Sequence, residues 1–365
     1  MNTQKFIREA VVNKEEILKL FNIGGIKAKY KIEFKEDWDT VFSNLNYQFV
    51  ASTDLHLEYQ SAYHSSSDAK ITDVSVVIYR NLNPIAVFPL CIEERQNQIK
   101  LSSFGKPINE PLYAKYISNN EKKSLTKKVI NSLKLIARSL ELDFLILEQA
   151  SVPHSDNNGC SEWHIQLLSE GALLEIKHDM FLDLSPDLKD IRSRYRSSYK
   201  SLINRGLELW NISVMESRNA SRENWDDFKE LHRDAAGRVT RSELTWEIQC
   251  KMISNDCAFL VMLREKNASK LVGAAFFEYT KNEAYYSVGA YDRSYFDFPL
   301  GHVAQHTAIQ KFKIKSIGWY RIGERFYPKV SVNCSSKEVS ISNFKQGFSD
   351  HLICRFIYKL EIHDF

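Results

Sequence analysis

The sequence predicts an α+β protein with mixed sheets, divided into two domains of similar architecture. The chain has 365 residues, whereas a single hydrophobic core rarely grows beyond about 250–300 residues. One order of elements (helix, three antiparallel strands, helix, strand) is expected twice along the chain, and such a repeat predicts a tandem architecture. Hydrophobic residues make up 44% and charged residues 26%, which is typical of folded globular proteins and excludes a disordered chain.

The second copy of this order is the clearer one. Apolar residues at helical spacing predict helices over 223–236 and 245–253. Short apolar runs bounded by polar turns predict strands over 258–263, 271–279 and 283–291. After a loop over 292–301, a helix is expected over 302–315 and a last strand over 319–322.

The first copy follows the same order. A helix is expected over 55–64, three strands over 74–80, 84–92 and 98–104, an amphipathic helix over 121–140 and a strand over 144–147. The boundary is expected within the polar stretch 151–171, which gives domains 1–165 and 166–365. The first domain is expected to be a degenerate copy and the second to be catalytic. The alternative is that such runs recur by chance in α+β proteins.

Composition and residue spacing limit the possible partners, the compartment and the metal content of the protein. A net charge of +3 gives no argument for DNA binding, and no DNA partner is expected. The six cysteines lack metal-site or paired spacing, which favours reduced thiols and a cytoplasmic protein. No apolar run reaches the length of a membrane span, which leaves peripheral membrane contact open. His302 and His306 stand four apart but have no obvious third ligand, so no metal is expected.

One candidate site is the strand, loop and helix start over 285–324. The first N–H groups of a helix are unpaired and attract anions, so a glycine there lets a phosphate approach the backbone. Gly301, His302 and Val303 are therefore the expected cofactor-binding residues. The alternative is an ordinary turn in which Gly301 only provides the bend.

Two basic segments are candidate substrate sites. Arg192, Arg196 and Lys200 repeat at helical spacing, and a face that tolerates several like charges often has an anionic partner. Arg238 and Arg241 follow a helix stop and resemble a clamp for a carboxylate or phosphate. A solvated helix face and a plain surface turn are the respective alternatives.

Acid–base groups are expected near the strand ends of the second half. Catalysis by proton transfer needs a positioned acid or base, and hydrogen-bond donors stabilise negative charge that develops on a substrate. Asp292, Tyr291, His302 and Glu324 are the candidate catalytic residues, and Tyr286 is a candidate substrate contact. Glu278 is a further candidate base, and no spacing singles one of them out. The motifs of serine hydrolases, P-loop proteins, dinucleotide-binding proteins and zinc proteases are absent.

Several segments together resemble a known family. The runs LHRDAAGRVTRSELTW, AFLVMLREKNASKLVGAAFFEYTKNEAYYSVGAYDR and LGHVAQHTAIQKFKIKSIGWYRIGE, with the basic segment RSRYRSSYKSLINRG, resemble the FemAB-like acyltransferases of the GNAT fold. The segments DLHLEYQSAYH, IAVFPLCIEE and LSSFGKPINEP are similar to their N-terminal half. The resemblance covers most of residues 40–325.

This resemblance implies tandem GNAT-type domains and transfer of an acyl or aminoacyl group onto an amine in peptidoglycan or surface polysaccharide synthesis. The donor it implies is acyl-CoA or, as the alternative, aminoacyl-tRNA, and the acceptor is an amino sugar on a lipid- or nucleotide-linked glycan. Arg192, Arg196 and Lys200 would contact an anionic substrate, and Arg238 and Arg241 would line the acceptor site. The rival from another class is a non-catalytic scaffold of an envelope glycan pathway.

Overall fold

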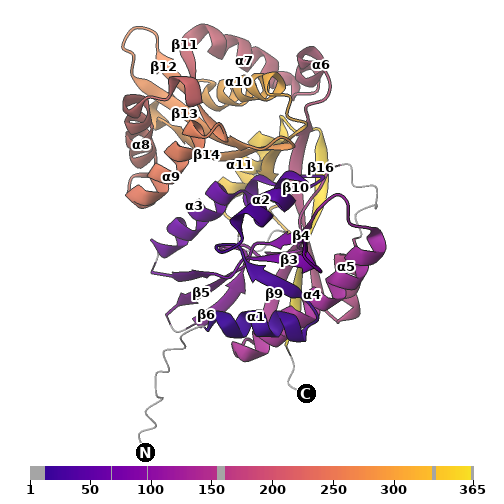
Figure 1. Cartoon of the computed structure of the whole chain (residues 1–365). Helices are drawn as coiled ribbons and strands as arrows, with labels where there is room; N and C mark the ends of the chain where they lie inside the picture. The colour runs from indigo at the N-terminus through magenta and orange to yellow at the C-terminus, as the bar shows by residue number, and fades with distance from the viewer. Residues whose placement is uncertain (1–12, 67, 97, 154–160, 331–333, 363–365) are drawn as a thin grey trace, which may run out of the picture.

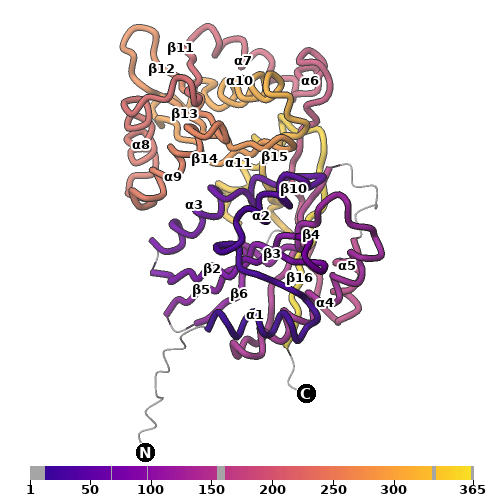
Figure 2. The backbone as a smooth tube through the Cα atoms, viewed as in Figure 1, coloured from indigo at the N-terminus to yellow at the C-terminus, as the bar shows by residue number. Residues whose placement is uncertain are grey.

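The computed structural model describes residues 13–66, 68–96, 98–153, 161–330 and 334–362 (Figure 1). It shows two lobes, the N-terminal one in indigo and magenta and the C-terminal one mostly in rose and orange. The backbone trace shows the yellow end of the chain returning beside the N-terminal lobe (Figure 2). Helices and mixed sheets occur in both lobes, which confirms the α+β prediction.

A nine-stranded sheet runs through both halves in the order β11-β12-β13-β14-β15-β10-β16-β9-β7. Its strands are β7 (Ile108–Asn109), β9 (Phe144–Gln149), β10 (Leu173–Asp183), β11 (Trp210–Met215), β12 (Ala258–Glu265), β13 (Leu271–Tyr279), β14 (Glu283–Tyr291), β15 (Trp319–Glu324) and β16 (His351–Glu361). β16 pairs with β10 on one side and β9 on the other. Strands of the first half (β7 and β9) and the last strand of the described chain (β16) thus meet in one sheet. The boundary expected within 151–171 stays a prediction.

The N-terminal half adds two smaller sheets. One contains β1 (Lys27–Tyr30), β3 (Val76–Arg80), β4 (Asn83–Phe88) and β8 (Leu112–Tyr113), and the other contains β2 (Lys70–Asp73), β5 (Cys91–Arg95) and β6 (Gln98–Ser102). The single strand expected over 84–92 is therefore two strands in different sheets. Pro89 lies between β4 and β5, and a proline cannot donate a ladder hydrogen bond, so the chain leaves one sheet there and joins the next.

The helices of the N-terminal half pack against these two sheets and against strands β9 and β16 of the nine-stranded sheet. They are α1 (Lys14–Ile23), α2 (Lys35–Ser43), α3 (Asp54–Ser65), α4 (Asn119–Ser139) and α5 (Glu162–Ser169), with a short 3-10 turn, η1 (Val50–Ser52). The stripe predicted on α4 is buried at Val129, Leu133 and Ile136. The predicted boundary stretch contains α5, and its residues 154–160 lie outside the described part.

The C-terminal half encloses its sheet between two helical layers. α7 (Ser197–Leu209) and α10 (Leu300–Ile314) cover one face, and α8 (Arg222–Ala236) and α9 (Glu243–Ser254) cover the other (Figure 1). Strand alternation produces this arrangement, because Phe259 and Val261 of β12 face α10 while Leu260 and Met262 face α8 and α9. A strand buried on both faces reads as the continuous apolar run seen in the sequence.

Each half contains one short parallel strand pair joined by a helical crossover. β7 pairs with β9 across α4, and β14 pairs with β15 across α10. The β14–β15 ladder consists of Glu283, Ala284 and Tyr285 opposite 319–321, after which β14 and β15 part. The order expected for the second copy is therefore present, whereas the three strands expected in the first copy are divided between two sheets. The parting of β14 and β15 leaves a notch between these strands.

The predicted basic helix is interrupted. It forms α6 (Leu188–Ser193) and α7, and Arg196 takes an extended conformation as the residue before α7. Ile191, Tyr195 and Tyr199 are buried on the side of these helices that faces the core. Arg192 and Arg196 accordingly lie on either side of a break instead of on one continuous helix face.

Two further observations concern the described residues. None of their helices has both the length and the apolar composition needed to cross a bilayer. Cys91, Cys250, Cys257, Cys334 and Cys354 form no disulfide, and Cys160 lies outside the described part.

The contact between α7 and α10 depends on Gly206. A Cβ there would lie 2.2 Å from Cγ2 of Val303 and 3.2 Å from the carbonyl oxygen of Pro299. We expect Gly206→Ala to lower the free energy of unfolding by about 1–3 kcal/mol, because the buried Val303 must move. Denaturant unfolding measures the change. Gly318→Ala is the control, since its Cβ would meet its nearest atom at 3.7 Å; equal losses in the two variants would contradict the proposed contact.

Candidate functional site

A cavity of about 200 Å³ lies between the two halves, at the point where β14 and β15 part. Its walls combine residues of the N-terminal half with residues of the long sheet. They include His56, Lys106, Asn109, Glu148 and Ala150 from the first group and Asp179, Glu283, Tyr285, Arg321, Gly323, Glu324 and Arg355 from the second. The volume fits the reacting end of a substrate and is smaller than a typical site for a whole ligand.

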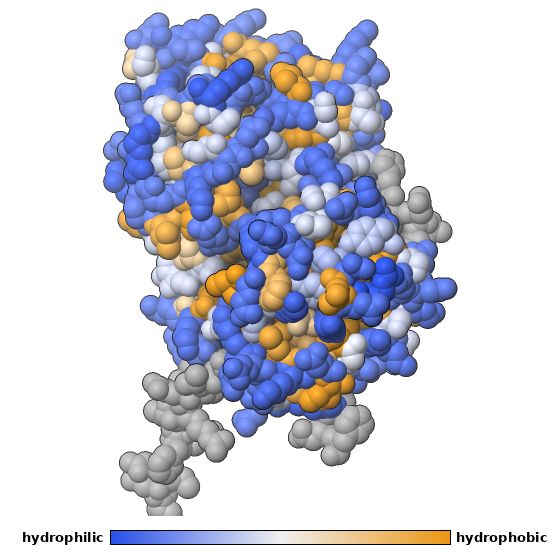
Figure 3. Space-filling view, viewed as in Figure 1, coloured by the Kyte–Doolittle hydropathy of each residue, from blue (hydrophilic) through white to orange (hydrophobic). Residues whose placement is uncertain are grey.

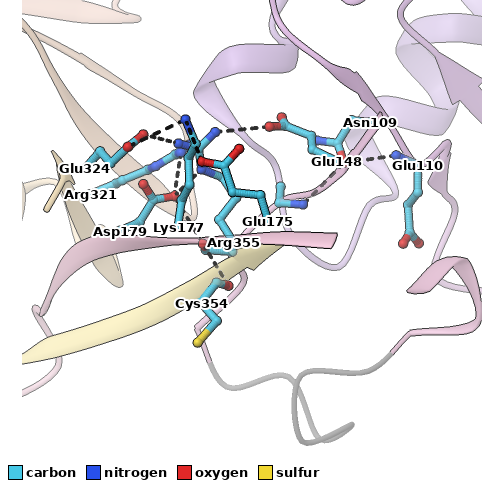
Figure 4. Close-up of polar contacts among 12 residues, drawn as sticks. Asn109, Glu110, Glu148, Glu175, Lys177, Asp179, Arg321, Glu324, Cys354 and Arg355 are labelled. Carbon is cyan, nitrogen blue, oxygen red and sulfur yellow. Dashed lines mark hydrogen bonds and ion pairs between the residues drawn. The ribbon is translucent and has the colours of Figure 1, made fainter. Parts of the chain in front are cut away.

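Asp179 is the centre of an ion network below this cavity (Figure 4). Its Oδ2 accepts a hydrogen bond from Nη2 of Arg321 at 2.7 Å and lies 3.3 Å from Nε of Arg355. Arg355 Nη1 donates to Glu148 at 3.2 Å. These four residues come from the adjacent strands β15, β10, β16 and β9. Asp179 is 1% exposed, and two guanidinium groups compensate its buried charge.

The ion network extends to Glu324, the last residue of β15. Arg355 Nη2 also donates to Glu324, and Lys177 Nζ lies 3.9 Å from the other carboxylate oxygen of Glu324 (Figure 4). Burial raises the pKa of Glu324, while Arg355 and Lys177 oppose this shift. Glu324 is the predicted catalytic residue that lines the cavity, and its role as an acid or base stays a prediction.

Glu283 binds the N-terminal half to the nine-stranded sheet through hydrogen bonds. Its carboxylate accepts the backbone N–H of Val50 at 2.6 Å and the hydroxyl of Tyr47 at 3.0 Å. Burial raises the pKa of Glu283. Because these contacts join η1 to the first residue of β14, they hold the loop of the first half over the cavity.

A histidine–glutamate pair forms another wall. His56 of α3 places Nδ1 2.8 Å from Oε2 of Glu278 on β13, and both side chains are buried. The other ring nitrogen, Nε2, faces Nζ of Lys106 at 3.4 Å and the amide nitrogen of Gln60 at 3.2 Å. Burial lowers the pKa of His56. Although burial alone would raise the pKa of Glu278, His56 and Lys106 hold it below its usual value.

Several polar atoms of this region have no hydrogen-bond partner among the described residues. They are Oδ1 of Asp179, Oε1 of Glu278 and Nε of Arg321. Buried polar groups are nearly always paired, and an exception calls for an explanation such as water or a ligand. The cavity therefore offers both donors and acceptors to a small polar group.

The notch above the cavity is occupied by a side chain from α11 (Ser336–Gln346). Lys345 places Nζ 4.9 Å from the centre of the Tyr286 ring and 2.9 Å from where a Cβ on Gly323 would stand. Gly323 has φ of +140°, which side chains other than hydrogen rarely tolerate. Burial lowers the pKa of Lys345 to about 8. No residue of α11 had been predicted to belong to the site.

The start of α10, predicted as a cofactor site, is closely packed. A Cβ on Gly301 would lie 3.0 Å from the ring of Phe344, and Val303 is fully buried. The His302 ring packs against Tyr199 at 4.5 Å and Phe344 at 5.0 Å between centroids. Burial, with Arg196 nearby, lowers the pKa of His302 to about 4. The structure thus surrounds these residues with aromatic rings, and a cofactor-binding role for them stays a prediction.

The predicted basic residues lie away from the cavity walls. Arg192 donates to Asn204, and Arg196 donates to the carbonyl oxygen of Asn343 at 2.9 Å. Lys200 of α7 is half-buried, and its carbonyl oxygen accepts from Arg192 at 3.4 Å.

Arg238 and Arg241 line a separate hollow of about 570 Å³ between α8 and α9. Arg241 donates to Gln249 at 2.9 Å and to the hydroxyl of Tyr59 at 3.2 Å. Its guanidinium also lies 4.5 Å from the centre of the Trp246 ring. Tyr59 belongs to α3, the helix that carries His56, so Arg241 contacts a helix that also reaches the cavity.

Two of the other predicted catalytic residues, Tyr291 and Asp292, lie at the far end of β14. Asp292 accepts a hydrogen bond from Lys270 at 2.8 Å, and this bond holds the pKa of Asp292 at about 2. The hydroxyls of Tyr286 and Tyr291 are 3.4 Å apart. Lys270 and Asp292 line a hollow on the outer side of α8. The structure does not bring Asp292 together with Glu324.

Sequence reasoning missed most of the cavity. Asp179, Arg355 and Glu148 belong to strands whose pairing partners are remote in sequence, and the 207-residue separation of Arg355 from Glu148 leaves no local pattern. His56 lies in a helix that the sequence predicts, but only its contact with Glu278 in the folded protein identifies it as a candidate functional residue. Charged residues within otherwise apolar strands were the one available signal.

Solved structures with the same arrangement are found. FemX aligns with a TM-score of 0.63 at 12% identity, over 88% of this chain and 95% of FemX. This chain has a FemX-like fold. The prediction of a FemAB-like, GNAT-type fold is therefore confirmed. No protein-family model matches the sequence, and neither does any curated protein.

Two further structures resemble the FemX-like fold. A conserved protein of unknown function from Bacteroides thetaiotaomicron aligns with a TM-score of 0.55 at 11% identity, over 89% of this chain and 97% of that one. The second is a C-terminal domain (DUF2156) of an Agrobacterium fabrum protein described as a lysylphosphatidylglycerol synthetase. It aligns with a TM-score of 0.52 at 10% identity, over 96% of this chain and 92% of that one. At these identities the likeness concerns the fold.

The described side chains around the cavity are not arranged as the ligands of a metal ion. Among the residues that the structure describes, no group of three or more His, Cys, Asp or Glu side chains is arranged to hold a metal ion. The carboxylates at the cavity are instead engaged by guanidinium, hydroxyl and backbone donors.

Lys345 gives a stability prediction. Its pKa of about 8 lies below the usual value near 10.4, so the unfolded chain binds more protons between these values and the free energy of unfolding rises with pH there. We expect Lys345→Met to remove this rise and to stabilise the protein at pH 7 by about 2–3 kcal/mol. Denaturant unfolding at pH 7 and pH 10 measures both effects.

The control for this prediction is Lys337→Met, because Lys337 is exposed on the same helix. We expect this variant to retain the pH dependence of the parent protein. If Lys345→Met and Lys337→Met behave alike, the ammonium of Lys345 is not buried in the notch.

Proposed function

We propose that this chain is an acyltransferase that joins an acyl or aminoacyl group to an amine during assembly of a cell-envelope component. The observation that carries the proposal is the polar cavity at the point where the parallel strands β14 and β15 part. Parted strands expose backbone groups that a carbonyl or amide of a donor can use, and the cavity supplies charged groups beside them. The FemX-like fold is consistent with this activity.

The cavity contains the groups that such a transfer needs. A tetrahedral intermediate places negative charge on the former carbonyl oxygen, and preorganised donors stabilise that charge. Tyr285, Arg321 and Lys106 line the cavity and carry N–H or O–H groups. Oδ1 of Asp179, which has no partner among the described residues, can accept a hydrogen bond from the acceptor amine. Reaction would proceed by direct attack, with positioning as the main contribution.

The donor in this proposal is acyl-CoA, with aminoacyl-tRNA as the alternative, and the acceptor is an amino sugar on a nucleotide- or lipid-linked glycan. Gly301, His302 and Val303 remain the proposed contacts of the donor, and Arg192, Arg196 and Lys200 those of an anionic carrier. Arg238, Arg241 and Tyr286 remain proposed substrate contacts, and Asp292, Tyr291, His302 and Glu324 proposed catalytic residues. Because α11 covers the start of α10, binding of a donor there requires this helix to move.

A wide groove on the surface supports an extended acceptor. It has a volume of about 710 Å³ and lies between α3 and α9, where Leu57, Leu244 and Ile248 provide apolar walls. Its charged residues are of both signs, and Lys31 and Lys35 are paired with Asp54. The face in Figure 3 shows hydrophobic side chains gathered at this junction of the two lobes, within a mostly hydrophilic surface. α3 contributes residues both to this groove and, through His56, to the cavity.

The proposal is tested by filling the cavity. We expect the protein to transfer the acyl group of acetyl-CoA, or alanine from alanyl-tRNA, to a nucleotide-linked amino sugar such as UDP-glucosamine, detected as a mass increase of the acceptor. Ala150→Leu places a larger side chain in the cavity wall, and we expect it to lower kcat/KM at least about tenfold, because a substrate displaced by about 1 Å loses much of its rate.

The matched control is Ala220→Leu, because Ala220 is exposed and lies outside the cavity walls. We expect it to retain the parent rate. Thermal unfolding with each donor and acceptor shows binding separately from turnover. Binding without turnover for both donor classes would favour a scaffold, and equal rates for the two leucine variants would place the reaction elsewhere.

A further inference from the structure

We infer that His56, held by Glu278, is the base that removes the proton from the acceptor amine, and this inference rests on the proposed acyl transfer. His56, on α3, lies in the cavity wall, and Glu278, on β13, contacts it from behind. The sequence marks Glu278 as a candidate base but does not indicate its partner, because His56 is 222 residues away. Only the fold brings them within 2.8 Å.

The hydrogen bonds determine which nitrogen of His56 is available. An ionised carboxylate only accepts hydrogen bonds, so Nδ1, next to Glu278, carries the proton. In the neutral ring Nε2 then has a lone pair that accepts hydrogen bonds, and the acceptor amine would replace one of its present donors. The neighbours of Nε2 agree with this, because the amide of Gln60 at 3.2 Å and the amine of Lys106 at 3.4 Å are both donors. The arrangement is a base whose orientation is fixed by a buried acid.

The surroundings keep His56 neutral and therefore able to accept a proton. Burial lowers the pKa of His56; Glu278 opposes this, and Lys106 and Arg321 add to it. Glu278 is buried on β13, Lys106 approaches from the segment before β7, and Arg321 approaches from β15. Gln60 and Tyr59 on α3 complete the contacts of the ring. Removing the charge of Glu278 would lower the pKa of His56 further.

The proposed step balances as follows. The nitrogen of the acceptor R–NH₂ forms a bond to the carbonyl carbon of the donor R′–CO–X, where X is the sulfur of a thioester or the oxygen of an ester. The N–H proton passes to Nε2 of His56 as the tetrahedral intermediate forms. The C–X bond then breaks, and X leaves with the proton returned from His56. The products are the amide R′–CO–NH–R and HX, and His56 is neutral again.

The test uses the full chain and whichever of acetyl-CoA or alanyl-tRNA supports transfer to UDP-glucosamine. We expect His56→Gln to lower kcat at least about 100-fold, the usual contribution of a general base. KM and the thermal shift with each substrate should stay within about twofold, because binding does not need the base. His164→Gln is the control, since His164 is also paired, through Nδ1 to Tyr358 at 2.6 Å, and lies outside the cavity walls.

A second variant and a rescue separate catalysis from structure. We expect Glu278→Gln to move the acid limb of the pH profile of kcat/KM to lower pH, because the neutral amide no longer favours protonated His56. Glu278 is a positioning residue, and a purely structural role would leave this limb in place. We also expect imidazole in the assay to restore part of the activity of His56→Ala.

The outcomes are distinct. If the parent protein transfers neither donor group, the proposed function is wrong and the inference fails with it. If the parent transfers and folded His56→Gln keeps a rate within about threefold, the proposed function holds and the inference is overturned. If His56→Gln fails to fold, the pH profile of Glu278→Gln decides, and an unmoved acid limb counts against the inference.

Discussion

The two halves of this protein meet around one buried carboxylate. Asp179 is almost completely inaccessible, and its charge is compatible with burial because Arg321 and Arg355 reach it from the neighbouring strands. Breaking such a pair by removing one partner leaves an uncompensated charge, which costs far more than the pair itself contributes. The network therefore fixes the relative position of β15, β10, β16 and β9, and with them the walls of the cavity.

This constraint explains why polar groups are concentrated where an apolar core would stabilise the chain more simply. Buried ion networks contribute little net stability compared with well-packed apolar residues. Here the network lies beside the parted strands β14 and β15. Glu283 binds the N-terminal loop at Val50, and polar atoms such as Oδ1 of Asp179 have no hydrogen-bond partner among the described residues. Polar residues that weaken the packing of a sheet and remain grouped at one cavity are typical of a functional site.

The sequence predicted the elements well and the site poorly, and the reason is physical. Period-2 and period-3.6 patterns are local, so α4, α8 and the strands β12 to β14 were predicted within a few residues. The strand 84–92 was wrong as a single element because Pro89 changes its sheet. β16 and α11 had no predicted place, although β16 completes the sheet and Lys345 of α11 lies in the notch. Of the predicted catalytic residues, Glu324 reached the cavity, whereas the pairing of Asp179, Arg355, His56 and Glu278 depends on contacts between remote segments.

The position of β16 has a consequence for synthesis of the chain. This strand lies between β10 and β9, yet it leaves the ribosome after both of them. Until residues 351–361 emerge, two central strands have exposed edges facing each other, and exposed edges invite pairing with other chains. Contacts between remote segments also form slowly. The nascent protein thus passes through a stage in which both lobes are made but Arg355 has not yet joined them, and we expect chaperones that shield strand edges to act at that stage.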